Sequence, residues 1–489
     1  MEEATINSIV PLLAALTPIA AALIIPLCRD DENKRERVSV IAAFITFLLV
    51  ASMVPKVMNG QIIRCDLAEI LPGFTVGFRV DGFGMLFSMV SSFLWIFTTF
   101  YSIGYMRGLN EHAQTRYYTC FALTLGSAIG VAFSGSLFTL YLCYELVSIF
   151  TYPLVVHHED KEGQQGARKY LVYLMGAGKL FFLPALVLTY ILAGNLDFGP
   201  QAILSGDSNH TVLIVLYILF LAGLAKAGLM PFHSWLPSAM VAPTPVSALL
   251  HAVAVVKVGV FCVARVIYNV FGPELMQNLH LVMPTAYLAS ATILIASMIA
   301  LTHDNLKARL AFSTVSQLAY ITLGFALVSV SGLTGGAIHI ANHAFSKITL
   351  FYCAGAIFVA TGKKYVSQMA GIGRLMPITM AAFTIGAFSM IGVPGTAGFI
   401  SKWFLGLGAL DNNSMLLLVL LLTSSLLNAG YFLPVIYQAF FRKYAAEDAH
   451  LTEAKPAMVV PLAVTAVITV LLGIFPGPLL QLIRGVIGS

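Results

Sequence analysis

The chain has 489 residues, of which 58% are hydrophobic and only 10% are charged. A soluble domain carries about 25% charged residues, so this composition excludes an ordinary soluble enzyme and indicates a protein built from membrane-spanning helices. The net charge of +5 is spread through loops without exposed aromatic residues, which argues against nucleic acid as a partner and leaves the lipid bilayer as the expected surroundings.

A helix that crosses a bilayer needs roughly 20 apolar residues. By this criterion the sequence predicts an all-α polytopic membrane protein with about 14 transmembrane helices. In chain order they are expected at 5–27, 38–58, 81–106, 116–134, 136–156, 165–193, 211–230, 246–270, 279–301, 306–330, 334–361, 373–407, 413–441 and 457–484. The stretch 59–79 is too polar to cross the membrane and is expected to form a small surface hairpin.

The seventh and twelfth predicted helices are broken. The seventh carries Lys226 and is expected to end at Pro231, whereas the twelfth carries Lys402 and is interrupted by Val-Pro-Gly at 393–395. Proline removes a backbone donor and frees a carbonyl one turn back, and such groups must face protein or water inside a membrane. We therefore expect both lysines to lie beside internal water and not beside lipid.

The matching breaks suggest two related units of five helices, the second inverted relative to the first. On this division the chain has four parts. They are 1–115 with helices 1–3, 116–271 with the first five-helix repeat (helices 4–8), 272–441 with the second repeat (helices 9–13), and 442–489 with helix 14.

Basic residues predict how the chain is oriented in the cell's inner (plasma) membrane. Loops after odd-numbered helices are rich in them, as at Arg29, Lys34 and Arg107, whereas the opposite loops hold few, such as Lys56 and Arg64. Because basic loops stay on the inner side, both termini are expected on the outer side.

Charged residues inside the predicted helices are few. Glu145 is the only acidic residue well inside a helix, and Asp81 stands at the start of the third. The basic ones are Lys179, Lys226, Lys257, Lys347 and Lys402. A charge at the bilayer centre costs about 2.5–3.5 kcal/mol, so these residues must face one another or water.

Lysine suits proton transfer because burial favours its neutral form, whereas a nearby carboxylate favours its charged form. A carboxylate moving towards Lys226 would load a proton, and its withdrawal would release one. Glu145 is the carboxylate available for this role. The alternative is that Glu145 and a lysine form a static pair that locks two helices together, but the number of buried lysines favours a relay.

His339, His343 and Lys347 are spaced at i, i+4 and i+8 and so share one face of a helix. A proton relay is the favoured interpretation; a metal site and simple hydrogen bonds between helices are the alternatives. No metal is expected, because no carboxylate or cysteine joins these residues locally and the six cysteines form no CxxC pair. His251 and Lys257 lie on different faces of the eighth helix and could serve successive steps.

Other polar residues have more ordinary interpretations. Lys179 is either a second partner for the buried glutamate or a side chain that reaches the membrane surface, and it is counted with Asp81 as an accessory position. His157 and His158 are expected to be solvated loop residues. Tyr117 and Trp235 are expected to be anchors at the membrane interface.

Several motifs give the chain a specific resemblance that runs from about residue 81 to residue 440. It resembles the antiporter-like subunits of respiratory complex I, of membrane-bound hydrogenases and of multisubunit sodium/proton antiporters. The motifs are LAKAGLMPFHSWLPSAMVAPTPVSALLHA, IHIANHAFSKITLF, LKARLAFSTVSQLAY, GVPGTAGFISKW and, less specific alone, YELVSIFTYPLV.

The resemblance implies a role for each matching residue. Glu145 and Lys226 correspond to the family's coupling pair, and Lys402 corresponds to the terminal lysine that exchanges protons with the outer side. The positions implied between them are His251, Lys257, His339, His343 and Lys347. The implied architecture is fourteen helices with two inverted five-helix units.

The resemblance also implies a function. The chain is expected to be a proton-translocating membrane subunit of a redox-driven pump similar to complex I, either an NADH or ferredoxin:quinone oxidoreductase or a membrane-bound hydrogenase. It should itself carry no redox cofactor, because the redox centres and the quinone or hydrogenase site belong to partner subunits. The alternatives are a subunit of a multisubunit Na⁺/H⁺ antiporter, a solute transporter working alone, and a structural membrane subunit that pumps nothing.

Overall fold

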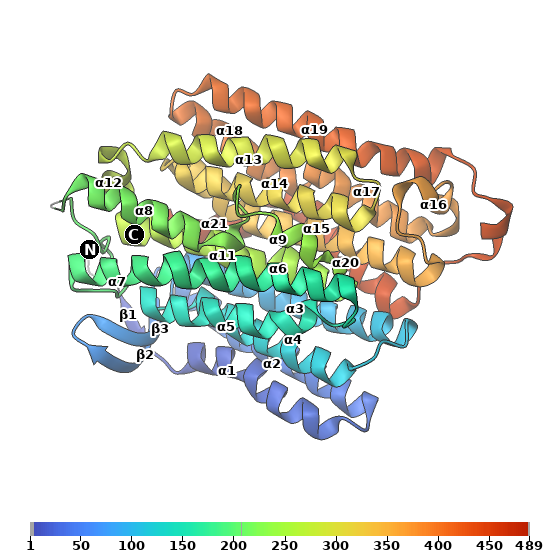
Figure 1. Cartoon of the computed structure of the whole chain (residues 1–489), viewed down its shortest axis with the longest axis horizontal. Coiled ribbons are helices and arrows are strands. Elements are labelled where there is room, and N and C mark those ends of the chain that lie inside the picture. The colour runs from blue at the N-terminus through green and yellow to red at the C-terminus, as the bar shows by residue number, and fades with distance from the viewer. Residues whose placement is uncertain (1–3, 207, 488–489) are drawn as a thin grey trace.

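The computed structural model describes residues 4–206 and 208–487, and most of them are helical. The long helices run side by side along the longest axis of the molecule, and a small sheet lies at one end of them (Figure 1). Both chain termini lie at this same end of the helices. The two ends are called here the sheet end and the opposite end.

The elements follow the predicted order with some differences in their bounds. The strands are β1 Thr5–Asn7, β2 Ile62–Leu71 and β3 Phe74–Val80. The helices up to the first break are α1 Val10–Ile24, η1 Ile25–Cys28, α2 Glu32–Met58, α3 Gly82–Gly108, α4 Gln114–Ala132, α5 Leu137–Val155, α6 Lys161–Ala177, η2 Gly178–Phe182, α7 Leu183–Ala193 and α8 His210–Gly223. The break and the buried helix after it comprise η3 Ala225–Ala227, α9 Trp235–Ser238, η4 Ala239–Val241, α10 Thr244–Val246, η5 Ser247–Ala254, α11 Val255–Arg265 and η6 Val266–Phe271. The remaining helices are α12 Pro273–Asn278, α13 Val282–Thr302, α14 Leu306–Ala326, α15 Val330–Thr361, η7 Val366–Gln368, α16 Ile372–Leu375, α17 Pro377–Ile391, α18 Ala397–Asp411, α19 Met415–Phe441, η8 Ala446–His450, α20 Pro456–Ile474 and α21 Gly477–Ile487.

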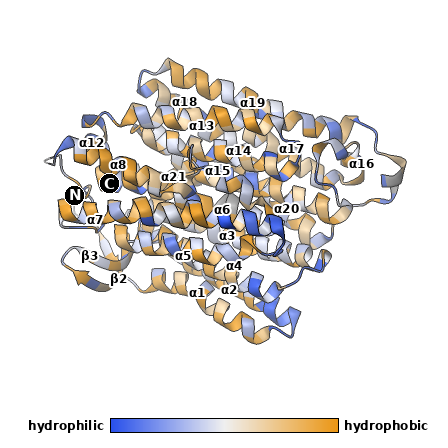
Figure 2. Cartoon of the chain, in the orientation of Figure 1, coloured by the Kyte–Doolittle hydropathy of each residue, from blue (hydrophilic) through white to orange (hydrophobic). Residues whose placement is uncertain are grey.

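Ten helical segments in the described part of the chain are long and apolar enough to cross a membrane. Hydrophobic residues cover most of their length, and many of the hydrophilic residues gather towards the two ends of the molecule (Figure 2). Two shorter apolar helices, α8 and α17, accompany them. The chain is therefore a polytopic membrane protein, as its composition predicts.

Helices α4 and α14 are long but are not among those ten segments. Both fall in predicted spans, at 116–134 and 306–330. Nearly every residue of α14 is buried among other helices, including Gln317 and several serines and threonines. A helix surrounded by protein can carry more polar side chains than a helix that faces lipid.

The predicted hairpin at 59–79 is confirmed. Strands β2 and β3 pair antiparallel around Pro72 and Gly73, with Ile63 opposite Val80. The sheet has a further strand that was not predicted, because β1 pairs in parallel with β2 from Thr5 to Asn7. The first predicted helix, 5–27, therefore begins too early in the sequence.

The first break begins earlier than the proline pattern predicts. Helix α8 ends at Gly223, so Lys226 lies beyond it, in the 3-10 turn η3, and not inside a helix that runs to Pro231. Part of the reason is packing, because a Cβ at Gly223 would lie 2.5 Å from the backbone nitrogen of Phe182. A further reason is that a side chain takes the place of a helical donor: Trp235 Nε1 donates to the carbonyl oxygen of Ala225 at 3.0 Å.

The second break agrees with the prediction. Helix α17 ends at Ile391 and α18 begins at Ala397, and Gly392 adopts a φ of +94° that residues with a side chain rarely adopt. The last predicted helix, 457–484, is instead two helices, α20 and α21. Phe475 separates them because a residue before proline disfavours the helical conformation.

The interior of the molecule is formed mainly by α11, α14 and α15. The segment Thr244–Phe271, which contains α11, is wholly buried in its apolar stretch, and most of α15 is buried. These helices carry Lys257, His339, His343 and Lys347, and all four side chains have no exposed surface. The charged and titratable groups of the chain's centre are therefore enclosed by protein.

Candidate functional site

Lys226 is the predicted relay residue at the first break. Its side chain is fully buried, and its Nζ donates to the carbonyl oxygen of Tyr144 at 2.7 Å and to Ser148 Oγ at 2.6 Å. The same ammonium lies 3.2 Å from the centroid of the Tyr144 ring. Both partners belong to α5, so the broken segment after α8 is attached to α5 through this lysine.

A glycine allows the broken segment to lie close to the buried helix α11. A Cβ at Gly259 would clash with the backbone of Lys226 and Ala227. Lys257 stands half a turn before this glycine on the same helix. No hydrogen bond among the described residues joins Lys226 directly to Lys257.

Glu145 follows Tyr144 on α5, and its carboxylate is not hydrogen-bonded to Lys226. Its carboxylate faces Gly178 of η2, where a Cβ would clash with Oε1. Neither carboxylate oxygen accepts a hydrogen bond from the described residues, and no ion pair between Glu145 and Lys226 is found within that part of the chain. The predicted coupling pair is therefore adjacent in the fold and not in contact.

Lys179 lies beside the same carboxylate on η2, and its side chain is exposed on the outside of the helices. No ion pair joins it to Glu145 in the described chain. Of the two interpretations offered by the sequence, a side chain that extends along the surface agrees with this position.

Lys257 and His343 are two titratable groups in direct contact in the interior. Lys257 Nζ lies 2.6 Å from His343 Nδ1, and α11 and α15 supply one residue each. A hydrogen bond between an amine and an imidazole nitrogen requires a lone pair on one of them, so the pair cannot be fully protonated on both sides. This is the geometry of two groups that exchange one proton.

The predicted stripe on α15 is present. The rings of His339 and His343 are 5.8 Å apart between centroids, and His339 donates from Nε2 to Gln317 Oε1 at 3.0 Å. Its Nδ1 lies 2.7 Å from Ser401 Oγ, one residue before Lys402. His251 belongs to η5, but its side chain lies outside the described residues.

Lys347 is connected to α19 through hydroxyl groups that the sequence analysis did not single out. Its Nζ donates to Ser313 Oγ at 2.8 Å, and that oxygen lies 3.0 Å from the Tyr431 hydroxyl. The Tyr431 hydroxyl donates in turn to Oδ1 of Asn428. Serine, tyrosine and asparagine are common in helices, so only their mutual positions identify them.

The chain of contacts ends near Lys402 at the second break. Asn428 Nδ2 donates to the carbonyl oxygen of Met390 at 3.0 Å, and Lys402 Nζ donates to the same oxygen at 2.8 Å. Lys402 also donates to the carbonyl oxygen of Ile391 at 2.9 Å and to Ser425 Oγ at 3.1 Å. The half-buried lysine thus occupies the free carbonyls at the end of α17.

Asp81 has a different environment from the relay residues. It accepts a hydrogen bond from the backbone N–H of Gly84 and two from Arg265, at 2.6 and 2.8 Å, and it also pairs with Arg79. Burial raises the pKa of Asp81, but the charges and hydrogen bonds of Arg265 and the charge of Arg79 outweigh this effect and lower the pKa to about 2. A carboxylate that stays ionised suits the attachment of α3 to α11 better than proton exchange.

Three loop or interface assignments from the sequence are wrong. Trp235 is fully buried at the first break, and Tyr117 is buried with its hydroxyl 2.7 Å from Ser102 Oγ, so neither is an interface anchor. His157 is fully buried and is not a solvated loop residue. In each case a neighbouring loop or helix covers a side chain that local sequence places near a helix end.

A cavity of about 620 Å³ lies at the opposite end, beside the first break. Its walls include Tyr105, Glu111, His158, Pro237, Met240, Val241, Ala242, Thr244, Asn305, Lys307 and Lys363. Lys307 Nζ donates to the carbonyl oxygen of Ala242 at 2.7 Å, which satisfies one carbonyl freed by the break. The segment that follows Lys226 at the first break thus lines a polar cavity, whereas Lys226 itself is not among the lining residues.

Glu111 is one of three acidic residues in this cavity wall, with Asp160 and Glu162. Burial raises the pKa of its carboxyl, but its contacts with His157 and His158 lower it to about 2. The hydrogen bond to Glu111 raises the pKa of His158, whereas burial lowers the pKa of His157. The cavity therefore presents an ionised carboxylate beside histidines in two different environments.

Related proteins share this fold over almost the whole chain. The membrane-bound sulfane sulfur reductase (MBS), an archaeal respiratory membrane complex, contains a chain with a TM-score of 0.89 and 26% identity, covering 98% of this chain and 97% of that one. A chain of the Mrp complex from a Dietzia species has a TM-score of 0.85 at 22% identity, which shows a shared fold.

Sequence relatives carry names of two kinds. NADH-quinone oxidoreductase subunit N of Desulforudis audaxviator is 30% identical over 489 residues, which is 95% of each chain. Na(+)/H(+) antiporter subunit A1 of Staphylococcus haemolyticus is 30% identical over 96% of this chain. The match covers 61% of that antiporter subunit, so the chain corresponds to less than two thirds of it.

The family model described as "NADH:quinone oxidoreductase/Mrp antiporter, TM" matches residues 134–428. This region includes both breaks, the stripe on α15, Lys402, and the hydroxyl chain as far as Ser313 and Asn428, whereas Tyr431 lies just beyond it. With its fold and its similarity over almost the whole chain in agreement with that match, the chain belongs to the NADH:quinone oxidoreductase/Mrp antiporter family of membrane subunits.

Proposed function

We propose that this antiporter-like subunit moves protons through the membrane along its buried lysines and histidines. The observation that carries the proposal is the Lys257–His343 contact at 2.6 Å, because two titratable groups from different helices share a hydrogen bond in the wholly buried interior. A buried amine beside an imidazole is costly to maintain for structural reasons alone. Transfer of a proton between Lys257 and His343 would give both buried groups a functional role.

The proposed path begins at the opposite end, at the cavity beside the first break. It continues through Lys226, then through Lys257 or His251, and along the stripe His339, His343 and Lys347. The gap between Lys226 and Lys257 requires ordered water, since no protein hydrogen bond spans it in the described chain.

The last part of the proposed path ends at Lys402. Two branches lead towards it: one from His339 through Ser401, and one from Lys347 through Ser313, Tyr431 and Asn428. Lys402 then exchanges protons with the outer side. Its half-buried position at the broken end of α17 suits that exchange.

Glu145 is proposed to tune Lys226. Its carboxylate makes no hydrogen bond with the described residues, so a small rotation about the side chain would cost no hydrogen bond to protein. It lies on η2's side of α5, near the exposed Lys179, and a charge in a neighbouring subunit would act on it there. Movement towards Lys226 would stabilise the charged lysine, and movement away would favour release of its proton.

The same proposal assigns the chain's topology. Adding α4, α8, α14 and the broken pair α17–α18 to the ten apolar segments makes about 14 spans. The proposed parts are 1–115, an inverted pair of five-helix units at 116–271 and 272–441, and 442–489. Both termini would lie on the outer side of the inner (plasma) membrane, with the larger cavity facing inwards.

We further propose that redox chemistry in partner subunits drives the protons. Relatives named as an NADH-quinone oxidoreductase subunit and a structure described as a respiratory membrane complex support this assignment. The electron carriers would belong to those partners and not to this chain. Moving one charge costs about 2.3 kcal/mol per 100 mV of membrane potential, which is the work the redox step must supply.

A sodium/proton antiporter is the second candidate. It is favoured by relatives named as Na(+)/H(+) and K(+)/H(+) antiporter subunits, the latter 33% identical over 79% of this chain. Sodium prefers oxygen ligands, and the free carbonyls of Met390 and Ile391 are occupied by Lys402. That arrangement favours protons over sodium at the second break.

The test is Lys226→Ala in the intact complex, reconstituted in vesicles with a pH-sensitive dye inside. We expect proton translocation to fall by about 100-fold or more, which is the usual effect of removing a positioned proton carrier. Lys56→Ala, an exposed lysine at the end of α2, serves as the control and should translocate normally. Unchanged translocation in the Lys226 variant would contradict the path, and transport that requires sodium would move the antiporter to first place.

A further inference from the structure

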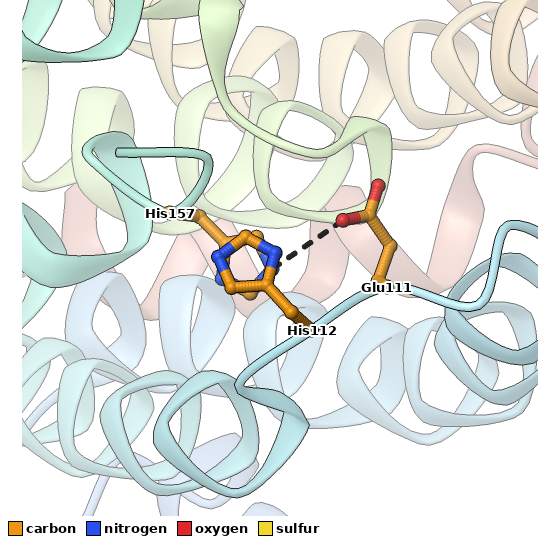
Figure 3. Close-up of side chains that lie close together, drawn as sticks. All are labelled: Glu111, His112 and His157. Carbon is orange, nitrogen blue, oxygen red and sulfur yellow. Dashed lines mark ion pairs between the residues drawn. The ribbon is translucent and has the colours of Figure 1, made fainter. Parts of the chain in front are cut away.

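Three potential metal ligands meet at the opposite end of the molecule. Glu111 and His112 belong to the loop between α3 and α4, and His157 follows α5. Each offers one ligand atom, and these atoms all lie within 4.8 Å of one another (Figure 3). The group unites two loops that are distant in the sequence, which is why the sequence pattern contains no metal motif.

His157 is the unusual member of this group. Its side chain is fully buried, yet neither ring nitrogen makes a hydrogen bond with the residues that the structure describes. Its Nε2 lies 3.7 Å from Glu111 Oε2, which is too long for a hydrogen bond. A buried imidazole without a hydrogen bond costs free energy that a bound ligand can recover.

The surroundings hold this imidazole in place. Arg116 donates to the carbonyl oxygen of His157 at 3.0 Å, and the ring of His157 lies 4.9 Å from that of His112 between centroids. His158 occupies the other oxygen of Glu111, Oε1, at 3.3 Å. Oε2 of Glu111 thus lies on the side of His157 (Figure 3), while His158 contacts the other carboxylate oxygen.

We propose that Glu111, His112 and His157 bind a divalent transition-metal ion of the zinc class, with a fourth position open to water. Two histidines and one glutamate form a ligand set that zinc accepts, with bonds of about 2.0–2.2 Å. In a tetrahedral site two such ligands lie about 3.4 Å apart, so the 4.8 Å spread requires the loops to close by about 1.4 Å. His112 is exposed and can supply that movement.

The position of the site gives the ion a consequence for transport. Glu111 and His158 line the cavity of about 620 Å³ beside the first break. A bound dication would add positive charge at the rim of this cavity and join the α3–α4 loop to the end of α5. This consequence, slower proton uptake, rests on the proposed function; the binding of the metal does not.

The test measures metal binding without turnover. The intact complex, stripped with a chelator and kept in mild detergent, is dialysed against Zn²⁺, and its zinc content is compared with that of the complex carrying His112→Ala. Because His112 is exposed, its replacement should leave assembly unchanged. His280→Ala, an exposed histidine at the sheet end, is the matched control.

We expect the wild type and the control to bind one ion per complex at this site. In the His112→Ala and His157→Gln variants the ion should be lost, or its affinity should fall at least about tenfold. Co²⁺ in place of Zn²⁺ should give the intense visible bands of a four-coordinate ion in the wild type and the His280→Ala control, and not in the His112→Ala and His157→Gln variants. Equal zinc content and affinity in the wild type and the His112→Ala variant would overturn the proposal.

A transport measurement separates the two claims. Zn²⁺ should slow proton uptake in the wild type more than in the His112→Ala variant. Zinc that binds at this site without slowing uptake would support the metal site and overturn uptake through this cavity.

Discussion

Tyr431 is the residue through which the interior of the second half connects Lys347 with the second break. Its hydroxyl lies 3.0 Å from Ser313 Oγ and donates to Asn428. Ser313 accepts a hydrogen bond from Lys347, and Asn428 shares the carbonyl oxygen of Met390 with Lys402. A hydroxyl can accept a proton from one side and give one to the other, whereas the amide of Asn428 and the carbonyl of Met390 cannot do so readily. The tyrosine oxygen is therefore the part of this branch whose removal is most informative.

Replacing Tyr431 with phenylalanine keeps the ring and removes only the hydroxyl. We expect proton translocation by the reconstituted complex to fall about 10- to 100-fold if this branch carries the flux. Tyr437→Phe, on the exposed side of the same helix, is the control and should behave as the wild type. An unchanged rate in Tyr431→Phe would place the flux on the branch through His339 and Ser401.

At the scale of secondary-structure elements, the first break depends on how closely it approaches α11. The chain departs from the helix after Gly223, and Trp235 and Lys307 supply hydrogen bonds to freed carbonyls. Gly259 allows the backbone around Lys226 to lie against α11. The break is thus held by specific contacts and not by the prolines alone.

Gly259→Ala tests that close packing. The added Cβ would meet the backbone of Lys226 and Ala227, which cannot move as a flexible side chain would, so we expect a loss of about 1–3 kcal/mol in stability. The complex should unfold at a lower temperature, measured by intrinsic fluorescence during heating. Gly176→Ala, on α6, is the control, because nothing lies within 4 Å of its Cβ and alanine favours a helix by about 1 kcal/mol. If both variants unfolded alike, the close approach at Gly259 would not matter to stability.

At the scale of the whole molecule, the two ends differ in composition and in shape. The sheet end holds both termini, the hairpin β2–β3 and the ion pairs of Asp81 with Arg265 and Arg79. The opposite end holds the large cavity and the cluster at Glu111. The proposed orientation places the sheet end outside the cell and the cavity inside it.

Accessibility of single cysteines tests this orientation. In a chain whose six native cysteines are replaced, Glu162→Cys at the start of α6 should be labelled by a membrane-impermeant maleimide only from the inner side. Gln201→Cys, in the loop before α8, should be labelled only from the outer side. Labelling of intact cells and inverted vesicles separates the two cases, and the reverse pattern would place the termini inside.

Much of the architecture is encoded locally. Runs of apolar residues predict most of the helices within a few residues, because each helix must satisfy its own backbone in lipid. The polar stretch at 59–79 predicts the hairpin, and the spacing of His339, His343 and Lys347 predicts their common face. The errors occur at element ends, at β1, at Lys226 beyond α8, and at Phe475 between α20 and α21. There, contacts with distant segments or single prolines decide where an element stops.

The types of residue in the chain are enough to establish a membrane protein with lysines and histidines inside it. Apolar side chains are costly to expose to water and charges are costly to place in lipid, and both costs depend on the residue type alone. Which of these groups touch one another depends on the packed structure. It separates Glu145 from Lys226, places Lys257 against His343, and gives His157 two potential metal-binding neighbours. Distances of a few ångströms between different helices and loops depend on how whole elements pack, and no local pattern of residues specifies them.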